Sequence, residues 1–217
     1  MALTLYMHPL ASFCHKVLLA LYENATPFES HQVDLSDATA RQAFRAIWPF
    51  AKFPLLRDSA RSQTVPESTI IIEYLERYYP GPLKLLPTAT ELALQVRATD
   101  RFYDLHVHEP MQKIVGDKLR PADGRDRIGV DQAWEQLQIA LQVADTEMGA
   151  RPWAAGDQFS MADCAAGPPL FFVDLMMPLA RPFPHVSAYL GRLTKRPSYV
   201  RVLAEAQPYL ELFPGRS

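Results

Sequence analysis

The spacing of apolar residues changes at a proline-rich segment, residues 80–87, and this change divides the chain into two unlike halves. Before the segment, short alternating runs are interleaved with runs of helical spacing. They predict strands at residues 3–7, 28–33, 53–57 and 63–65, and helices at 38–48, at 68–79 and from about residue 12. The order strand, helix, strand, helix, strand, strand, helix predicts a compact α/β unit.

After the proline-rich segment every apolar pattern has helical spacing. Six apolar residues recur at steps of three and four, which predicts a bundle helix: Val130, Trp134, Leu137, Leu141, Ala144 and Met148. Further helices are expected at 91–119, bent or interrupted at Pro110, and at 160–177, 185–195 and 198–207. We therefore expect a first domain at 1–80, a linker at 81–90 and an all-helical second domain at 91–217.

Composition excludes several classes of protein. The chain of 217 residues carries 22 Lys and Arg against 24 Asp and Glu, with no basic block, which argues against nucleic acid as a partner. No apolar run approaches the roughly 18 to 20 residues of a membrane span. The two cysteines, Cys14 and Cys164, are too few for a disulfide framework and suit a reducing compartment. These features favour a cytoplasmic protein with no membrane partner.

The motifs of several common enzyme classes are missing from the sequence. There is no G-x-G-x-x-G for a dinucleotide and no G-x-S-x-G for a serine hydrolase. His106 and His108 lie close to Glu109, but residues two apart on a helix point to different faces. Because H-E-x-x-H is also missing, we expect no metal site.

The turn into the first helix, residues 9–17, contains Ser12 and Cys14. A helix N-terminus exposes unpaired amides and the positive end of the helix dipole, so it stabilises an anion placed there. A thiolate is such an anion, whether it belongs to Cys14 or to a bound ligand. The sequence also fits a simpler interpretation, in which Ser12 caps the helix and Cys14 fills the core.

Two further motifs could hold an extended, peptide-like ligand. Proline opens the strand that follows Phe53, and a cis bond before Pro54 would turn the Phe53 peptide groups outward, although most X-Pro bonds are trans. Glu67 and Ser68 precede an apolar helix. Ser68 could donate to a ligand carboxylate and Glu67 could pair with an ammonium, or both could simply start the helix.

The order of these parts resembles that of cytosolic glutathione transferases over essentially the whole chain. Residues 153–163 are similar to the family's helix-start signature, in which Ser160 and Asp163 form a capping box. The resemblance implies a thioredoxin-like domain with a mixed four-stranded sheet, followed by an all-α helical bundle. It also implies glutathione as co-substrate, a homodimer and a role in detoxification.

The resemblance further assigns roles to residues of the predicted site. Phe53 would pair its backbone with the cysteinyl part of glutathione, next to a cis Pro54, while Lys52 would approach the glycine carboxylate. Glu67 and Ser68 would hold the γ-glutamyl end. An acidic residue near Asp100 or Asp104 would reach the neighbouring subunit's glutathione. The pocket for the apolar co-substrate would lie between the domains and be lined by Leu10, Phe13, Tyr103, His106 and Met111.

The residue that activates the thiol departs from the family's pattern. Ala11 stands where the resemblance places a serine or cysteine. Ser12 is then the leading candidate, with Cys14, Tyr6 or a backbone amide near Ala11 as alternatives. The implied activity is transfer of an alkyl or aryl group to glutathione, by attack of its thiol on a small apolar electrophile. A glutathione-dependent oxidoreductase or isomerase that uses Cys14 or Ser12, and a non-catalytic binding protein, remain as alternatives.

Overall fold

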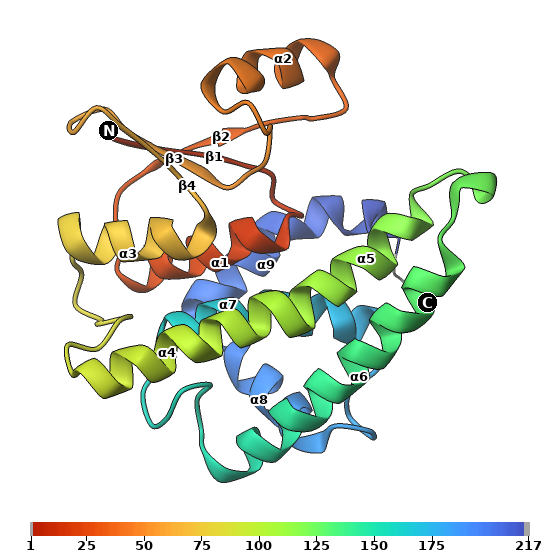
Figure 1. The fold of residues 1–217 in the computed structure, drawn as a ribbon. Coiled ribbons are helices and arrows are strands. Elements are labelled where there is room, and N and C mark those ends of the chain that lie inside the picture. The colour runs from red at the N-terminus through yellow and green to blue at the C-terminus, as the bar shows by residue number, and fades with distance from the viewer. Residues whose placement is uncertain (1, 215–217) are drawn as a thin grey trace.

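A mixed four-stranded sheet organises the first half of the chain. The computed structural model describes residues 2–214, and its sheet has the order β2-β1-β3-β4 (Figure 1). The strands are β1 (Leu3–Met7), β2 (Glu29–Gln32), β3 (Leu55–Asp58) and β4 (Gln63–Pro66). β1 pairs in parallel with β2 and antiparallel with β3, and β3 pairs antiparallel with β4. The mixed sheet expected from the sequence is confirmed.

Helices cover both faces of this sheet. Helix α2 (Ala38–Ile47) lies on one face, and α1 (Ser12–Glu23) and α3 (Ser68–Tyr78) lie on the other (Figure 1). Successive side chains of a strand point to opposite faces. Leu5 therefore lies in the larger core with α1, whereas its neighbour Tyr6 packs against Phe44 of α2.

The regular elements of the described second half are helices, as the sequence predicts, and loops that include one isolated β-bridge between Trp153 and Gly156 connect them. Its elements are α4 (Thr90–Phe102), a π-helical turn (Tyr103–His108), α5 (Glu109–Lys118), α6 (Arg127–Ala150), α7 (Met161–Met176), α8 (Pro184–Leu193) and α9 (Pro197–Ala206). Short 3₁₀ turns lie at Ala122–Gly124 and Gln207–Leu212. None of the described helices is both long enough and apolar enough to cross a membrane.

The irregularity in the long helical stretch is of a different kind from the bend expected at Pro110. Pro110 lies in the first turn of α5, where a missing amide proton costs little. The irregular segment is the π-helical turn before it, Tyr103–His108. A π-helical turn holds an additional residue, so it changes which side chains of α5 face the first half of the chain.

One hydrophobic core joins the two halves. Helix α1 lies between α3 of its own half and α7 and α9 of the helical half. Core side chains such as Leu18, Ile71 and Leu170 are each at most 1% exposed and belong to one contiguous cluster. A smaller second cluster around Phe44 lies under α2. The groove between the halves is therefore walled by elements that the core fixes firmly.

Candidate functional site

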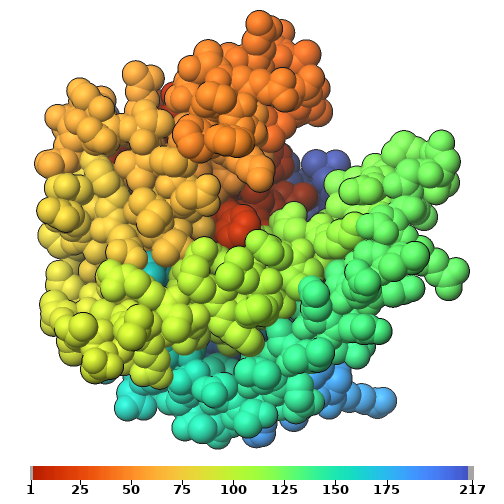
Figure 2. All heavy atoms as spheres, viewed as in Figure 1, coloured from red at the N-terminus to blue at the C-terminus, as the bar shows by residue number. Residues whose placement is uncertain are grey.

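Two connected cavities lie between the sheet domain and the helices α4 and α5. The first, of about 530 Å³, runs from Lys52 past Glu67 to Asp100. The second, of about 600 Å³, contains Ser12 and Gln112. In Figure 2 the surface is hollowed between the orange and yellow first half and the yellow-green α4 helix, with red atoms of the early chain at the floor.

The turn into β3 forms one wall of the first cavity. Lys52, Phe53 and Pro54 all line it, and the peptide bond between Phe53 and Pro54 is cis. Lys52 is exposed, whereas Pro54 is buried and fixes the turn against the sheet. A cationic side chain is thus placed directly beside the backbone of Phe53 in the same wall of the cavity.

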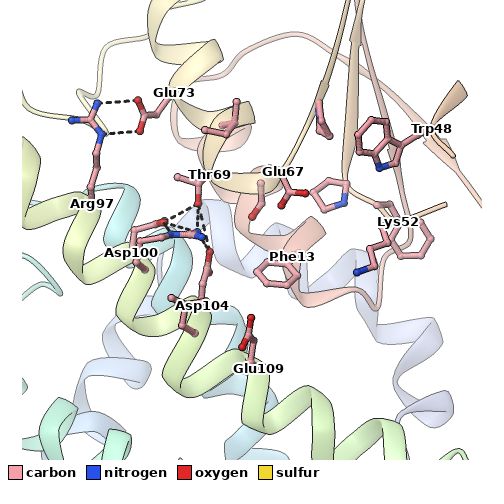
Figure 3. Close-up of a pocket in the computed structure, with 17 residues that line it drawn as sticks. Phe13, Trp48, Lys52, Glu67, Thr69, Glu73, Arg97, Asp100, Asp104 and Glu109 are labelled. Atoms are coloured by element: carbon pink, nitrogen blue, oxygen red, sulfur yellow. Dashed lines mark hydrogen bonds and ion pairs between the residues drawn. The ribbon is translucent and has the colours of Figure 1, made fainter. Parts of the chain in front are cut away.

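The start of α3 forms another part of the wall of this cavity, between Lys52 and Asp100 (Figure 3). Glu67 has a φ of 67°, a conformation that few residues other than glycine adopt, and this turns the chain sharply into α3. Ser68 is 6% exposed and lies in the first turn of the helix, where amides have no partner within the helix. A carboxylate that entered here would meet a hydroxyl, free amides and the positive end of the dipole.

A buried network of charges connects α1, α3 and α4 behind the cavity. The Nζ atom of Lys16 lies 2.7 Å from Asp100 Oδ1 and 2.8 Å from Asp104 Oδ2. The same amine donates to the Thr69 hydroxyl, which donates to Asp100 at 2.8 Å. Burial raises the pKa of Asp104, and the charge of Lys16 opposes that shift. Both aspartates are therefore engaged within this chain.

The exposed Arg101 closes this network at the cavity wall. Its guanidinium contacts Asp104 and lies 3.0 Å from Asp100, and it donates to Thr69 at 2.5 Å. Figure 3 shows these contacts beside the labelled Thr69, Asp100 and Asp104. Since two cations face two carboxylates, the network adds no net charge to the cavity.

Ser12 lies in the first turn of α1 and is hydrogen-bonded to the helical half. Its Oγ atom is in close contact with Nε2 of His108, and Gln112 donates to the same oxygen at 3.2 Å. His108 is 1% exposed, and burial lowers its pKa to about 3, so its imidazole is neutral near pH 7. The hydroxyl is thus held in place across the domain boundary.

The three alternatives to Ser12 lie in different surroundings. Cys14 is fully buried, and burial raises the pKa of its thiol to about 12. Tyr6 packs between His31 and Phe44 on the far face of the sheet, and neither cavity includes it. Ala11 lines the second cavity with a methyl group, and the amides of residues 12 and 13 follow it at the helix start.

The expected co-substrate residues separate into two groups. Leu10 and Phe13 line the second cavity. Tyr103 and Met111 are at most 2% exposed in the core, and His106 is exposed beside Phe102; none of these three lines either cavity. Sequence reasoning missed the residues of the helical half that line the cavities, which are Leu105, Glu109 and Gln112. It also missed the buried His108, which contacts Ser12 without lining either cavity.

Comparison with known proteins matches two family models to this chain. Residues 5–83 match a family model described as "Glutathione S-transferase, N-terminal domain", and residues 126–192 match "Glutathione S-transferase, C-terminal domain". Glutathione S-transferase 3 of Zea mays is 30% identical over 211 residues, which cover 93% of each chain. Glutathione S-transferase F6 of Arabidopsis thaliana is 28% identical over 205 residues, which cover 90% of this chain and 96% of the relative.

A solved structure resembles this chain in both fold and sequence. The theta class glutathione S-transferase of Xanthomonas axonopodis pv. citri, solved with glutathione bound, superposes with a TM-score of 0.77 at 27% identity. The superposition covers 92% of this chain and 96% of that structure. The likeness therefore extends over both halves of the chain.

Proposed function

Because this chain belongs to the glutathione S-transferase family, we propose that it is a glutathione transferase, which activates the thiol of glutathione for attack on a small apolar electrophile. One observation supports this most strongly. The Lys52–Pro54 turn and the start of α3 line a single cavity, which connects with a second cavity that contains Ser12. A tripeptide held by the first cavity would reach the second with its thiol.

The charges of the first cavity complement those of glutathione. Lys52 takes the glycine carboxylate, and Phe53, before the cis Pro54, pairs its backbone with the cysteinyl residue. The carboxylate of the γ-glutamyl end lies at Ser68, and its ammonium lies at Glu67. Each ionised group of the ligand thus has a partner of opposite charge or a free donor. These residues all belong to the proposed glutathione-binding domain, residues 1–80. A linker at 81–90 joins this domain to the helical domain, residues 91–217.

Ser12 is the proposed activator of the thiol. A glutathione thiol has an ordinary pKa of roughly 8.5 and is mostly protonated at neutral pH. A hydroxyl that donates to the sulfur favours the thiolate, and the N-terminus of α1 adds to this effect. Ser12 has a single proton to donate. When Nε2 of the neutral His108 ring carries the hydrogen, it donates to Ser12 Oγ. The hydroxyl proton of Ser12 is then free to be donated to the thiolate.

The electrophile would occupy the second cavity, between Leu10 and Phe13. The thiolate sulfur forms a bond to the electrophilic carbon, and the leaving group departs with its electron pair. Holding both reactants in connected cavities removes much of the entropic barrier to this step. A glutathione-dependent oxidoreductase would require an accessible Cys14 thiolate. The complete burial of Cys14 argues against this alternative.

A titration of the purified protein with glutathione tests this proposal, with the thiolate followed by ultraviolet absorbance. We expect saturable binding with a new thiolate signal in the wild type and in the Cys14→Ala control. Ser12→Ala should still bind glutathione, but with a thiol pKa higher by about one to two units, because one hydrogen bond to a charged group is lost. Binding without thiolate, or no binding, would contradict the proposal.

We also propose a cytoplasmic homodimer that acts in detoxification. The first half of one subunit would pack on the long helices of the other. Both cysteines are unpaired and buried, which is consistent with a reducing compartment. Light scattering should give twice the mass of the chain, and a monomer at micromolar concentration would contradict the dimer. The proposed chemistry uses no metal.

A further inference from the structure

The two cavities meet at a narrow set of residues. Four side chains line both of them: Phe13, Lys52, Phe53 and Glu109. A ligand that extends from the first cavity into the second must pass these four. In the proposed function this is where the thiol of glutathione lies, so the charges here act directly on the incoming electrophile.

Glu109 is the acidic residue at this junction. It begins α5, and Figure 3 shows its carboxylate directed from that helix toward the Phe13 ring. Within residues 2–214 its carboxylate makes neither an ion pair nor a hydrogen bond. The nearest cation along the helix, Lys113, is paired with Asp126 instead. Glu109 thus presents an uncompensated negative charge.

The other groups of the second cavity do not neutralise this charge. Lys52 is the one Lys or Arg among its described lining residues, and the proposed function assigns Lys52 to the glycine carboxylate. Burial lowers the pKa of His8, with Asp34 acting in the opposite direction, which leaves that imidazole mostly neutral near pH 7. When glutathione is bound as a thiolate, the electrophile therefore meets two negative charges within apolar walls.

We infer that Glu109 determines which electrophiles this enzyme accepts, favouring uncharged or cationic aromatic molecules over those that carry a carboxylate. The inference rests on the proposed function. Like charges in a partly desolvated cavity repel each other more strongly than in water. A carboxylate beside Glu109 would lose hydration and gain no cation in return. The aromatic walls, Phe13 and Phe53, still offer their full contact area to an uncharged ring.

A matched pair of electrophiles isolates charge from shape. The neutral probe is 4-chloro-3,5-dinitrobenzamide, and the anionic probe is 4-chloro-3,5-dinitrobenzoate. In both, the thiolate sulfur bonds to the ring carbon that carries chlorine, and chloride leaves with the bonding pair. The thiol proton goes to solvent, so each turnover yields a thioether, chloride and one proton. The measured quantity is the ratio of kcat/KM for the two probes, each divided by its uncatalysed rate.

We expect the wild type to prefer the neutral probe. Glu109→Gln keeps the size of the side chain and should move the ratio about tenfold toward the carboxylate, and Glu109→Lys should move it further. Added salt should narrow the preference of the wild type more than that of Glu109→Gln, because salt screens charges and the variant keeps only the charge of the thiolate. Glu135→Gln, on the exposed face of α6, is the matched control and should keep the wild-type ratio.

Two results would overturn the inference: a wild type that prefers the carboxylate, or ratios within twofold of the wild type in both Glu109 variants. Binding of the two S-aryl glutathione conjugates gives a readout that needs no turnover. If the wild type binds both conjugates equally and Glu109→Gln changes neither, the inference fails while the proposed function stands. If neither conjugate nor glutathione binds, the proposed function fails with it.

Discussion

At the scale of single residues, Ser12 and Cys14 show how position within one helical turn decides chemistry. Both lie at the N-terminus of α1, where the dipole favours an anion. Ser12 reaches the second cavity, whereas Cys14 points into the core and is fully buried. Desolvation outweighs the dipole for Cys14, so its pKa rises to about 12 instead of falling.

Cys14 should therefore resist alkylation in the folded protein. At pH 8 we expect iodoacetamide to leave both cysteines of the native protein unmodified, since Cys164 is also buried. Both should react within minutes in denaturant, as counted by mass spectrometry. An engineered Ala11→Cys variant, whose residue lines the second cavity, provides the reactive control. Rapid modification of native Cys14 would contradict its burial and revive the redox alternative.

Two buried histidines predict how stability depends on pH. Burial lowers the pKa of His108 to about 3 and that of His15 to about 4, from an ordinary 6.5. Both rings are therefore neutral in the folded protein and take up a proton when it unfolds below pH 6.5. Stability contributed by these rings is complete above that pH and is lost as the pH falls toward 4. Each ring should lower the free energy of unfolding by about 2 kcal/mol when the pH falls from 7 to 5.

Urea denaturation at pH 7 and pH 5 checks this prediction. The wild type should lose about 4 kcal/mol of unfolding free energy from the two histidines, and His15→Gln or His108→Gln should each lose about half of that. His106→Gln changes an exposed ring on the same π-helical turn and should behave as the wild type. Carboxyl groups also change stability between these pH values, but all four proteins contain the same ones, so their contributions cancel when the losses are compared. An equal loss in all four proteins would show that the buried rings do not titrate on unfolding.

At the scale of elements, the start of α7 depends on one carboxylate. Asp163 accepts from the Ser160 amide at 2.8 Å, from the Ala154 amide at 2.8 Å and from the Tyr189 hydroxyl at 2.6 Å. It is fully buried, so each of these donors loses its only partner if the carboxylate is removed. The capping box expected from the sequence is present, and it also anchors the preceding loop and α8.

Removing this carboxylate should destabilise the protein far more than removing an ordinary cap. Asp163→Ala is expected to cost at least about 3 kcal/mol, because several buried donors lose a charged acceptor, whereas Ser160→Ala should cost about 1 kcal/mol. The exposed Asp157→Ala, six residues earlier, serves as the control and should stay within about 0.5 kcal/mol. Urea unfolding midpoints of the three variants measure the order of their stability losses. Comparable losses of stability in Asp163→Ala and Asp157→Ala would contradict the prediction.

The same scale shows what the sequence can predict. Periodicity located the four strands and the α-helical stretches, with α4 and α5 taken as one, because each element must bury one face. Motifs that are local in the chain, such as Phe53–Pro54, could be recognised from adjacent residues. The contact of Ser12 with His108 joins residues 96 apart, and no local pattern indicates it. The π-helical turn had no recognisable signal either, and Glu109 was therefore not expected at the cavity.

At the scale of the whole molecule, the two halves share one core and several polar ties. Arg196 of the segment before α9 lies 2.6 Å from Glu23 of α1, and Tyr22 donates to Glu205 at 2.7 Å. Helix α2 is different, because Phe44 is its one buried side chain and it rests on the smaller cluster. The central elements should therefore open together, whereas α2 should open on its own.

Hydrogen exchange in increasing urea tests this difference. We expect β1, α1 and α7 to lose protection at the same urea concentration, although β1 and α7 belong to different halves. Amides of α2 should exchange at lower urea, since few apolar contacts oppose its opening. Separate loss of protection in β1 and α7 would mean that the halves unfold independently, and equal protection of α2 would contradict its weak attachment.

The π-helical turn at Tyr103–His108 has a consequence for reading evolutionary change in this protein. A turn of this kind arises when one residue is inserted into an α-helix and the helix keeps its ends in place. Positions after the turn are then offset by one residue from the equivalent positions of any homologue that lacks the insertion. An alignment that runs through this segment without a gap would pair Glu109 with the wrong position. The residues of the second cavity should therefore be compared among homologues by aligning α5 independently of α4.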